Sequence, residues 1–279
     1  MESCNVFLST KNCHERDKHI SFDEGPHIYT IKGKSDYESV TTWVHKQFEE
    51  FDADKIINNM MKNSEKWRLN KYYGMTKQEI IDMWNKNRDD AADAGTKLHY
   101  SIEYFYNHNE NMIMKPNVET ATQDTMDHPR PEWLDDLICN SIEYEYFLNF
   151  HKDHQHLTPY RTEWMIYDEE LKLAGSIDMV FEELDGSLSI YDWKRCKEIV
   201  KTSRYNKYST NETINYLPDT NYWHYCLQLN IYKALLEKNY GVTIKHLYLV
   251  CLHSNNKNYV KISVVDLQED VENLFKQRV

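Results

Sequence analysis

The chain has 279 residues, of which 41% are hydrophobic and 28% charged, and its formal net charge is −12. This composition is typical of a globular protein with one sizeable core, and the negative charge argues against a surface that coats nucleic acid non-specifically. We find no signal peptide and no long apolar segment, so we expect an intracellular, non-secreted protein that does not contact a membrane. The sequence does not indicate whether its compartment is the cytoplasm, the nucleus, an organelle or a viral compartment. The cysteines are scattered without a Cys-x-x-Cys pair, which argues against a zinc ribbon or an iron–sulfur cluster.

Near the N-terminus, residues 27–31 have the character of a short β-strand. Ser39 and Thr41 then precede an amphipathic stretch over residues 43–51, which predicts a helix that starts at these hydroxyl residues. The hydroxyls could cap the helix, or they could hold a phosphate of a nucleic acid at its N-terminus. Capping is the commoner use of such hydroxyls, and both interpretations stay open.

Two helical segments are predicted next. Residues 54–87 favour helix with a break near Gly74, and residues 88–107 predict the following helix. His99 and Glu103 are four residues apart in this second segment, so they lie on one helical face. A histidine on an apolar helical face is usually a core residue, but here an acid sits one turn later on the same face.

The middle of the chain suggests how the molecule is divided. A polar, proline-containing stretch predicts a loop, so we expect an insertion over residues 108–131. Residues 132–151 return to a helical period with apolar residues on one side. We expect residues 1–87 to form an N-terminal β/helical extension that packs on a core of residues 88–279, together as one compact unit.

A β-hairpin within residues 160–194 carries two acids and a lysine. Two stretches rich in branched and aromatic residues flank Leu184-Asp185-Gly186, which predicts a turn. A three-residue loop with its glycine in the left-handed conformation would place Asp178 directly opposite Asp192, and Lys194 shares the face of Asp192. A two-residue loop would place the acids on opposite faces. The three residues alone are also compatible with a salt bridge at a sheet end, because Asp-x-Lys often occurs by chance.

A basic connector follows the hairpin over residues 195–209. The net charge of this connector is +4, whereas the net charge of the whole chain is −12. Aromatic residues are interleaved with the basic residues or follow them. This mixture suits a single nucleic-acid strand, through attraction to the backbone and stacking on the bases, although a solvated mobile loop is an equal alternative. The candidate nucleic-acid contacts here are Arg195, Lys197, Lys201, Arg204, Tyr205, Lys207, Tyr208 and Trp223.

The last part of the chain mixes helices and strands. A helix that ends at a glycine cap carries Gln228 and Tyr232 on one face. The order of the elements predicts an α/β (α+β) fold, in which a mixed central β-sheet is flanked by helices and a helical N-terminal extension is added. The predicted elements are a helix over residues 221–239, strands over 245–252 and 259–265, and a closing helix over 267–277.

Seven short motifs occur in order along residues 27–265. They are His27-x-Tyr29, Ser39-Val40-Thr41, Gly95-Thr96-x-x-His99-x-x-x-Glu103, Glu163, Gly175-x-x-Asp178, Asp192-x-Lys194 and Gln228-x-x-x-Tyr232. Each is weak alone, but the complete order is specific. In this order the chain resembles the PD-(D/E)XK nuclease superfamily, and within it the RecB-like exonucleases, which include mitochondrial genome maintenance exonucleases and phage or viral relatives.

The resemblance implies a restriction-endonuclease-like core and roles for these residues. It implies a divalent-metal site built from His99, Asp178, Asp192 and the backbone carbonyl of Trp193. Lys194 would orient or activate the attacking water, and Gln228 and Tyr232 would shape the site and contact the substrate. Glu103 and Glu163 would serve a second metal ion or the bound strand.

The implied activity is that of a metal-dependent DNA exonuclease that prefers single strands or free ends, in DNA replication, repair or recombination. Oxygen ligands with few protein contacts suit Mg²⁺ or Mn²⁺, and one imidazole ligand shifts the preference toward Mn²⁺. The four-cysteine cluster of some relatives is missing, so no iron–sulfur cluster is expected. The alternatives are a structure-specific or flap endonuclease and a nucleic-acid-binding protein with an inactive nuclease fold. The expected partners are DNA and proteins of replication or repair.

Overall fold

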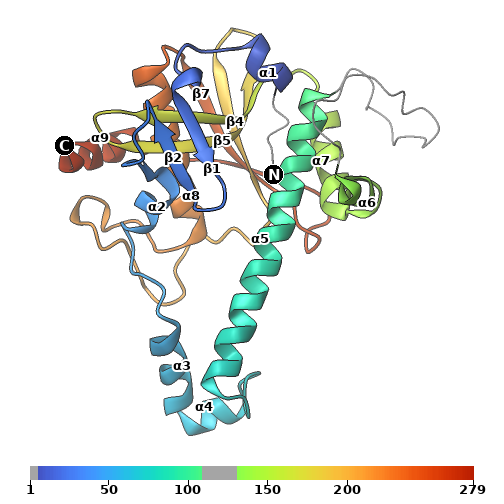
Figure 1. The fold of residues 1–279 in the computed structure, drawn as a ribbon. Coiled ribbons are helices and arrows are strands. Elements are labelled where there is room, and N and C mark those ends of the chain that lie inside the picture. The colour runs from blue at the N-terminus through green and yellow to red at the C-terminus, as the bar shows by residue number, and fades with distance from the viewer. Residues whose placement is uncertain (1–5, 109–130) are drawn as a thin grey trace.

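The computed structural model describes residues 6–108 and 131–279, so the predicted insertion lies almost entirely outside the described residues. A mixed six-stranded sheet forms the centre of the molecule (Figure 1). Its strands are β3 (Glu38–Ser39), β4 (Thr158–Asp168), β5 (Leu173–Glu182), β6 (Leu188–Lys194), β7 (Ile244–Cys251) and β8 (Val260–Ser263). Antiparallel β4 occupies one edge of β5, and parallel β3 and antiparallel β6 share the other edge. Strand β7 is parallel to β6, and β8 is antiparallel to β7.

Helices cover both faces of the sheet, which confirms the predicted α/β architecture. One face carries α2 (Val40–His45), α8 (Asn221–Asn239) and α9 (Gln268–Arg278), and the other carries α5 (Lys77–Asn107), α6 (Glu132–Asn140) and α7 (Ile142–Asp153). Alternate residues of the strands belong to two cores, because side chains alternate along a strand. Val180 and Ile190 pack on the first set of helices, and Phe181 and Tyr191 pack on the second. No helix among the described residues is both long and apolar enough to cross a membrane.

The N-terminal elements add a small third core beside β4 and β5. The strand predicted over residues 27–31 is present as β2 (Ile28–Ile31), and it pairs antiparallel with β1 (Ile20–Asp23). Tyr29 and Ile31 of β2 are buried together with Tyr167 of β4 and Ala174 of β5. The hairpin is preceded by α1 (Val6–Lys11), which the sequence did not reveal.

Helix α5 is longer than the sequence pattern predicted. It runs unbroken from Lys77 to Asn107, so the prediction of a separate helix over residues 88–107 was wrong, and α5 crosses the expected division between residues 87 and 88. Thr76 and Glu79 form a capping box at its start, in which each side chain accepts a hydrogen bond from the backbone N–H of the other. The sequence signal Thr-x-x-Glu therefore marks the true beginning of this helix.

Helices α3 (Ala53–Lys62) and α4 (Ser64–Arg68) lie beside the first half of α5, and together they extend away from the sheet (Figure 1). We call residues 53–95 the helical arm. Ile57 and Ile80 are fully buried within it, and the indole Nε1 of Trp84 donates a hydrogen bond to the hydroxyl of Tyr72 at 2.9 Å. The arm therefore has its own packing, which fixes its three helices to one another.

The helix predicted over residues 132–151 is divided in two. Helix α6 ends at Asn140 and α7 begins at Ile142, with Ser141 between them in an extended conformation. The Ser141 side chain accepts a hydrogen bond from the backbone N–H of Tyr144 at 3.2 Å. The break is therefore an N-cap, which a continuous apolar period does not reveal.

Candidate active site

The hairpin of β5 and β6 has the predicted three-residue loop. Gly186 adopts a φ of +80°, in the left-handed region that a glycine enters without strain. The strands pair from Glu182 and Leu188 to Met179 and Tyr191, which is the predicted register, and the pairing ends next to Asp178 and Asp192. The predicted loop length and register are confirmed.

The sheet opens next to Asp178. Strand β3 pairs with residues 173–174 of β5, and β6 pairs with residues 179–182. Within the described chain, residues 175–178 therefore have no strand partner on this edge. The Asp178 carboxylate bridges the opening by accepting a hydrogen bond from the backbone N–H of Trp193 at 2.9 Å.

His99 of α5 lies against this opening. Its Nε2 donates a hydrogen bond to the Trp193 carbonyl oxygen at 2.9 Å, and its Nδ1 lies 3.6 Å from a carboxylate oxygen of Asp178. A carboxylate oxygen of Glu163 lies 3.8 Å from the same Nδ1. His99, Glu163 and Asp178 thus offer three ligand atoms that all lie within 4.8 Å of one another.

Glu163 reaches this group through a rarely adopted backbone conformation. Its φ is +42°, in the left-handed region, although it stands in the middle of β4 and the β4–β5 pairs on either side of it are kept. For a residue other than glycine this conformation costs about 1–3 kcal/mol, and such strain gathers at functional sites. The Ser176 hydroxyl donates a hydrogen bond to the Glu163 carboxylate at 2.8 Å, which fixes the direction of the side chain.

Asp192 and Lys194 form a buried ion pair beside the group. Their charged atoms lie 2.6 Å apart, and their side chains are only 3% and 16% exposed, respectively. The Lys194 ammonium also lies over the ring of Tyr225 in α8, 4.6 Å from its centre. The lysine is therefore held in one place by an acid on its own strand and by an aromatic ring on the helix above.

One face of α8 closes the site. Tyr225, Gln228 and Tyr232 follow one another at helical spacing, so they line a single stripe. The side-chain amide of Gln228 donates a hydrogen bond to the Tyr232 hydroxyl at 3.2 Å. The Tyr232 ring lies so close to the backbone of β5 that a Cβ atom at Gly175 would be 2.6 Å from ring atom Cε1. A glycine at position 175 is therefore required by the ring of Tyr232.

Replacing Gly175 with Ala is expected to lower the free energy of unfolding by about 1–3 kcal/mol, because the added methyl group overpacks a buried ring. Urea denaturation would measure this change. In a Tyr232→Leu background the methyl group finds space, so the same Gly175→Ala change should cost much less there. Equal costs in both backgrounds would show that Tyr232 is not what excludes a side chain at position 175.

The electrostatics of the site reflect crowded charges. Burial, followed by repulsion from Asp192, raises the pKa of Asp178 to about 7. Burial alone would lower the pKa of His99, but attraction to Asp178 and Glu163 outweighs it and raises this pKa to about 9. For Lys194 too, the effect of burial is outweighed by the neighbouring acids Asp192 and Asp178, which raise its pKa above the ordinary value. Acidic and basic groups are therefore crowded together at this centre, and each shifts the pKa of its neighbours.

The other residues expected near the site lie apart from this centre. Glu103 is buried one turn further along α5, outside the group of ligand atoms. Ser39 caps α2 by accepting a hydrogen bond from the Thr42 N–H at 3.0 Å, which is the capping interpretation of the hydroxyls. Thr41 is exposed on the first turn of α2. A phosphate contact at Ser39 and Thr41 remains a prediction.

The basic connector is largely irregular, and several of its cations have acidic partners. Arg195 pairs with Glu143 at 3.2 Å, Arg204 with Glu198 at 3.9 Å, and Lys207 with Glu49 at 2.7 Å. Lys201 lies over the ring of Tyr222, and its carbonyl oxygen accepts a hydrogen bond from the Trp223 indole. Lys197 is exposed, as are Tyr205 and Tyr208.

Two residues at the site were not singled out from the sequence. Tyr225 precedes Gln228 by three residues, so the helical period that grouped Gln228 with Tyr232 could have found it. Ser176 carried no signal, because its part in the site depends on the backbone conformation of Glu163 on a neighbouring strand.

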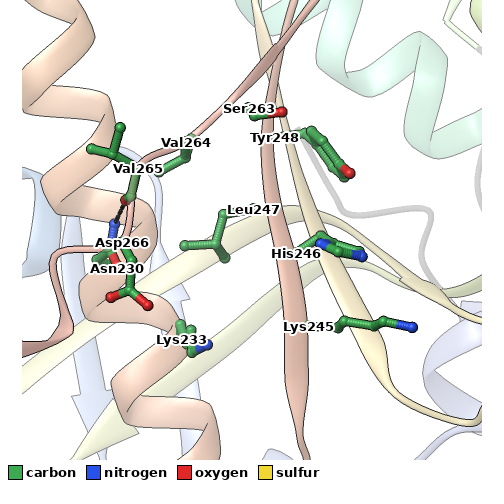
Figure 2. Close-up of a pocket in the computed structure, with 10 residues that line it drawn as sticks. All are labelled: Asn230, Lys233, Lys245, His246, Leu247, Tyr248, Ser263, Val264, Val265 and Asp266. Atoms are coloured by element: carbon green, nitrogen blue, oxygen red, sulfur yellow. Dashed lines mark hydrogen bonds between the residues drawn. The ribbon is translucent and has the colours of Figure 1, made fainter.

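Two hollows of the described surface are relevant to the site. One of about 430 Å³ borders the site, since Glu163 and Arg161 of β4 line it together with residues of α1 and β1. The other, of about 120 Å³, lies between α8 and the strands β7 and β8 (Figure 2). There the Asn230 side chain donates a hydrogen bond to the Val265 carbonyl at 2.9 Å and accepts one from the Leu267 N–H at 2.9 Å. These hydrogen bonds connect α8 to the segment that follows β8, so the residues around this second hollow have a structural role. None of the candidate site residues lines it.

The ligand atoms at the opening fit a divalent cation. One imidazole nitrogen and the carboxylate oxygens of Glu163 and Asp178 form a donor set that suits Mn²⁺ or Mg²⁺. A cation there would relieve the repulsion that raises the pKa of Asp178. The resemblance implied Asp192 as a ligand, whereas the geometry groups Glu163 with His99 and Asp178 and pairs Asp192 with Lys194.

Replacing His99 with Ala is expected to weaken Mn²⁺ binding at least tenfold, because a ligand is removed. Titration calorimetry with Mn²⁺ would measure the affinity, and thermal denaturation would show that the variant is folded. His246→Ala is a matched control, since His246 is exposed on β7. An unchanged affinity for Mn²⁺ would make His99 a core histidine rather than a ligand.

The fold and the site together place this protein among α/β proteins with a restriction-endonuclease-like core. A family model described as the PD-(D/E)XK nuclease superfamily matches residues 56–279, which is most of the chain. The chain therefore belongs to the PD-(D/E)XK nuclease superfamily. The match begins within α3, so it includes most of the helical arm as well as the sheet. A comparison with curated proteins found no match.

Proposed function

We propose that this protein is a divalent-metal-dependent DNA exonuclease of the RecB-like branch, which hydrolyses phosphodiester bonds and prefers single strands or free ends. The observation that carries the proposal is the convergence of His99, Glu163 and Asp178 where β5 and β6 separate, next to the Asp192–Lys194 pair. The motifs in the sequence support the branch, and DNA replication, repair or recombination is the proposed setting.

The residues of the site have distinct parts in this proposal. His99, Glu163 and Asp178 would hold the cation, with Asp192 and the Trp193 carbonyl beside them. A bound divalent cation stabilises negative charge on the phosphate and lowers the pKa of a bound water molecule. Lys194 is fixed by Asp192 and Tyr225, so its ammonium can orient a water molecule that attacks the phosphate.

Substrate contacts are proposed on both sides of this centre. The hollow of about 430 Å³ at Glu163 offers room for part of a nucleotide. On the other side, Gln228 and Tyr232 of α8 are available to shape the site around the strand. Glu103, buried one turn beyond His99 on α5, keeps its proposed role of serving a second metal ion or the bound strand.

A DNA strand labelled at one end tests the activity. Purified protein with Mn²⁺ should shorten single-stranded DNA progressively from an end, and EDTA should stop the reaction. A closed circular single strand should not be cleaved, because it has no free end at which an exonuclease could start. Cleavage of the circle would instead favour an endonuclease, and no cleavage of any DNA or RNA under these conditions would favour the inactive nucleic-acid-binding alternative.

The basic connector is proposed to line the path of the strand. Replacing Lys201, Arg204 and Lys207 together by Gln should weaken DNA binding and reduce its salt dependence, because each lost phosphate contact removes about one unit of slope. Fluorescence anisotropy at several salt concentrations would measure both effects. An unchanged slope would mean that the strand runs elsewhere and that the connector is a solvated loop.

A further inference from the structure

The end of the helical arm is basic. We define the arm tip as residues 62–73, which include the last residue of α3, the whole of α4 and the turn before α5. The arm tip contains four basic residues and one acidic residue, Glu65, so its net charge is +3, whereas the net charge of the whole chain is −12. The cations are Lys62, Lys66, Arg68 and Lys71, and all four are exposed.

Among the described residues, these cations have no acidic partner. Within residues 6–108 and 131–279, no carboxylate lies within 4.0 Å of any of the four, although exposed lysines elsewhere, such as Lys86 of α5, do form ion pairs. The connector differs in this respect, because Arg195, Arg204 and Lys207 each pair with an acid. The arm tip is therefore a positive surface whose charge is not neutralised by the protein.

Apolar and aromatic side chains accompany the charges. Leu69 is 90% exposed and Tyr73 is 56% exposed, so both side chains are available at this surface. The Lys71 ammonium lies over the ring of Tyr72, 4.7 Å from its centre. Cations with an accessible aromatic ring beside them suit a nucleic-acid strand, through attraction to the phosphates and by stacking on the bases.

The arm tip is connected to the candidate active site by a single helix. Helix α5 starts at Lys77, next to the tip, and carries His99 twenty-two residues later without a break (Figure 1). At a rise of 1.5 Å per residue these two positions are about 33 Å apart along the helix axis. Buried Ile57 and Ile80 and the Trp84–Tyr72 hydrogen bond hold the arm together, so this separation is built into the structure.

We propose that the arm tip is a second nucleic-acid contact, which binds the backbone of the substrate at a distance from the bond that is cut. The inference rests on the proposed function. A polymer that reaches both places must span about 33 Å, which corresponds to about ten stacked nucleotides at 3.4 Å each. A nucleic acid is favoured over an acidic protein or a lipid surface because the same rigid helix carries both the tip and His99.

The length of the substrate provides the test. Binding is measured by fluorescence anisotropy, with EDTA present to prevent metal-dependent cleavage, for single strands of about 30 and about four nucleotides. Only the longer strand can reach the tip, so wild-type protein should prefer it. The variant Lys62→Gln/Lys66→Gln/Arg68→Gln/Lys71→Gln should lose about tenfold or more in affinity for the longer strand at low salt, and the slope of log K against log salt should fall by about three.

A matched control removes the same charge elsewhere. Lys32→Gln/Lys152→Gln/Lys245→Gln/Lys276→Gln also removes four exposed positive charges, none of them on the arm, and should keep the preference for the longer strand. Circular dichroism and the melting temperature would show that both variants are folded. Equal losses in the two variants would overturn the inference, because net charge rather than the arm tip would then explain binding.

Two further outcomes separate the inference from the proposed function. If wild-type protein cuts DNA with Mn²⁺ but the tip variant keeps the full preference for the longer strand, the arm tip is not a substrate contact and the nuclease assignment stands. If the tip variant instead loses binding to vesicles that contain anionic phospholipid, with DNA binding unchanged, the surface is a lipid contact and the inference is wrong.

Discussion

Replacing Asp192 with Asn should reduce phosphodiester cleavage by about a thousandfold or more. The substitution keeps the size of the side chain but removes a negative charge beside the proposed metal ligands and the acidic partner of Lys194, 2.6 Å away. Loss of charge stabilisation at a phosphoryl-transfer site has effects of this size. Single-turnover cleavage of an end-labelled strand with Mn²⁺ would measure the rate.

Binding should persist in this variant, because the proposed phosphate contacts lie on the connector and the arm tip. Anisotropy at low salt would show this. Asp185→Asn is a matched control, since Asp185 lies in the loop of the same hairpin and pairs with exposed Lys245. The control should cut at the wild-type rate. An Asp192→Asn variant that also cuts at this rate would remove the active-site assignment.

Replacing Lys194 with Met should lower the free energy of unfolding by about 3–5 kcal/mol, the cost of breaking a buried ion pair from one side. Asp192 is 3% exposed and would be left without its partner, while Asp178 remains nearby. Activity should also fall, by about a hundredfold or more, because the group that orients the attacking water is gone. Urea denaturation and single-turnover kinetics would measure the two effects.

The matched control is Lys245→Met, which breaks the exposed pair with Asp185. An exposed pair contributes about 0–1 kcal/mol, so this control should change stability little. Mn²⁺ should stabilise the Lys194→Met variant, since a bound cation supplies positive charge near the same acids. If Lys194→Met is as stable as Lys245→Met, the buried pair does not hold the site together.

The local parts of the site could be predicted because their causes are local. The register of the hairpin follows from the length of its loop and from the conformation that Gly186 allows, so the pairing of β5 with β6 as far as Met179 and Tyr191 could be predicted. The shared face of Gln228 and Tyr232 follows from the helical period alone. The covering of the central sheet by helices follows from the order of the elements along the chain.

The rest depends on contacts between distant parts of the chain. Nothing next to Glu163 in the sequence indicates a positive φ, which arises from its place in the folded sheet, so its position beside His99 could not be predicted. The pairing of Lys207 with Glu49 joins residues that are 158 apart, and it changes how the basic connector is interpreted. The length of α5 differs from the prediction for a local reason, because the capping box of Thr76 and Glu79 starts the helix at Lys77 and nothing interrupts it before Asn107.

Because α5 is continuous, the direction in which the arm tip lies relative to His99 depends on the number of residues in the helix between them. Each residue of an α-helix turns the chain by about 100°. One residue inserted into the exposed stretch 89–92 would rotate the arm tip to a different side of the molecule relative to His99, while shifting it by only about 1.5 Å. Seven inserted residues, which are close to two full turns, would return the tip to within about 20° of its original direction and move it outward by about 10 Å. The arm can therefore change its reach without changing its direction only by insertions close to a whole number of turns, such as seven or eleven residues.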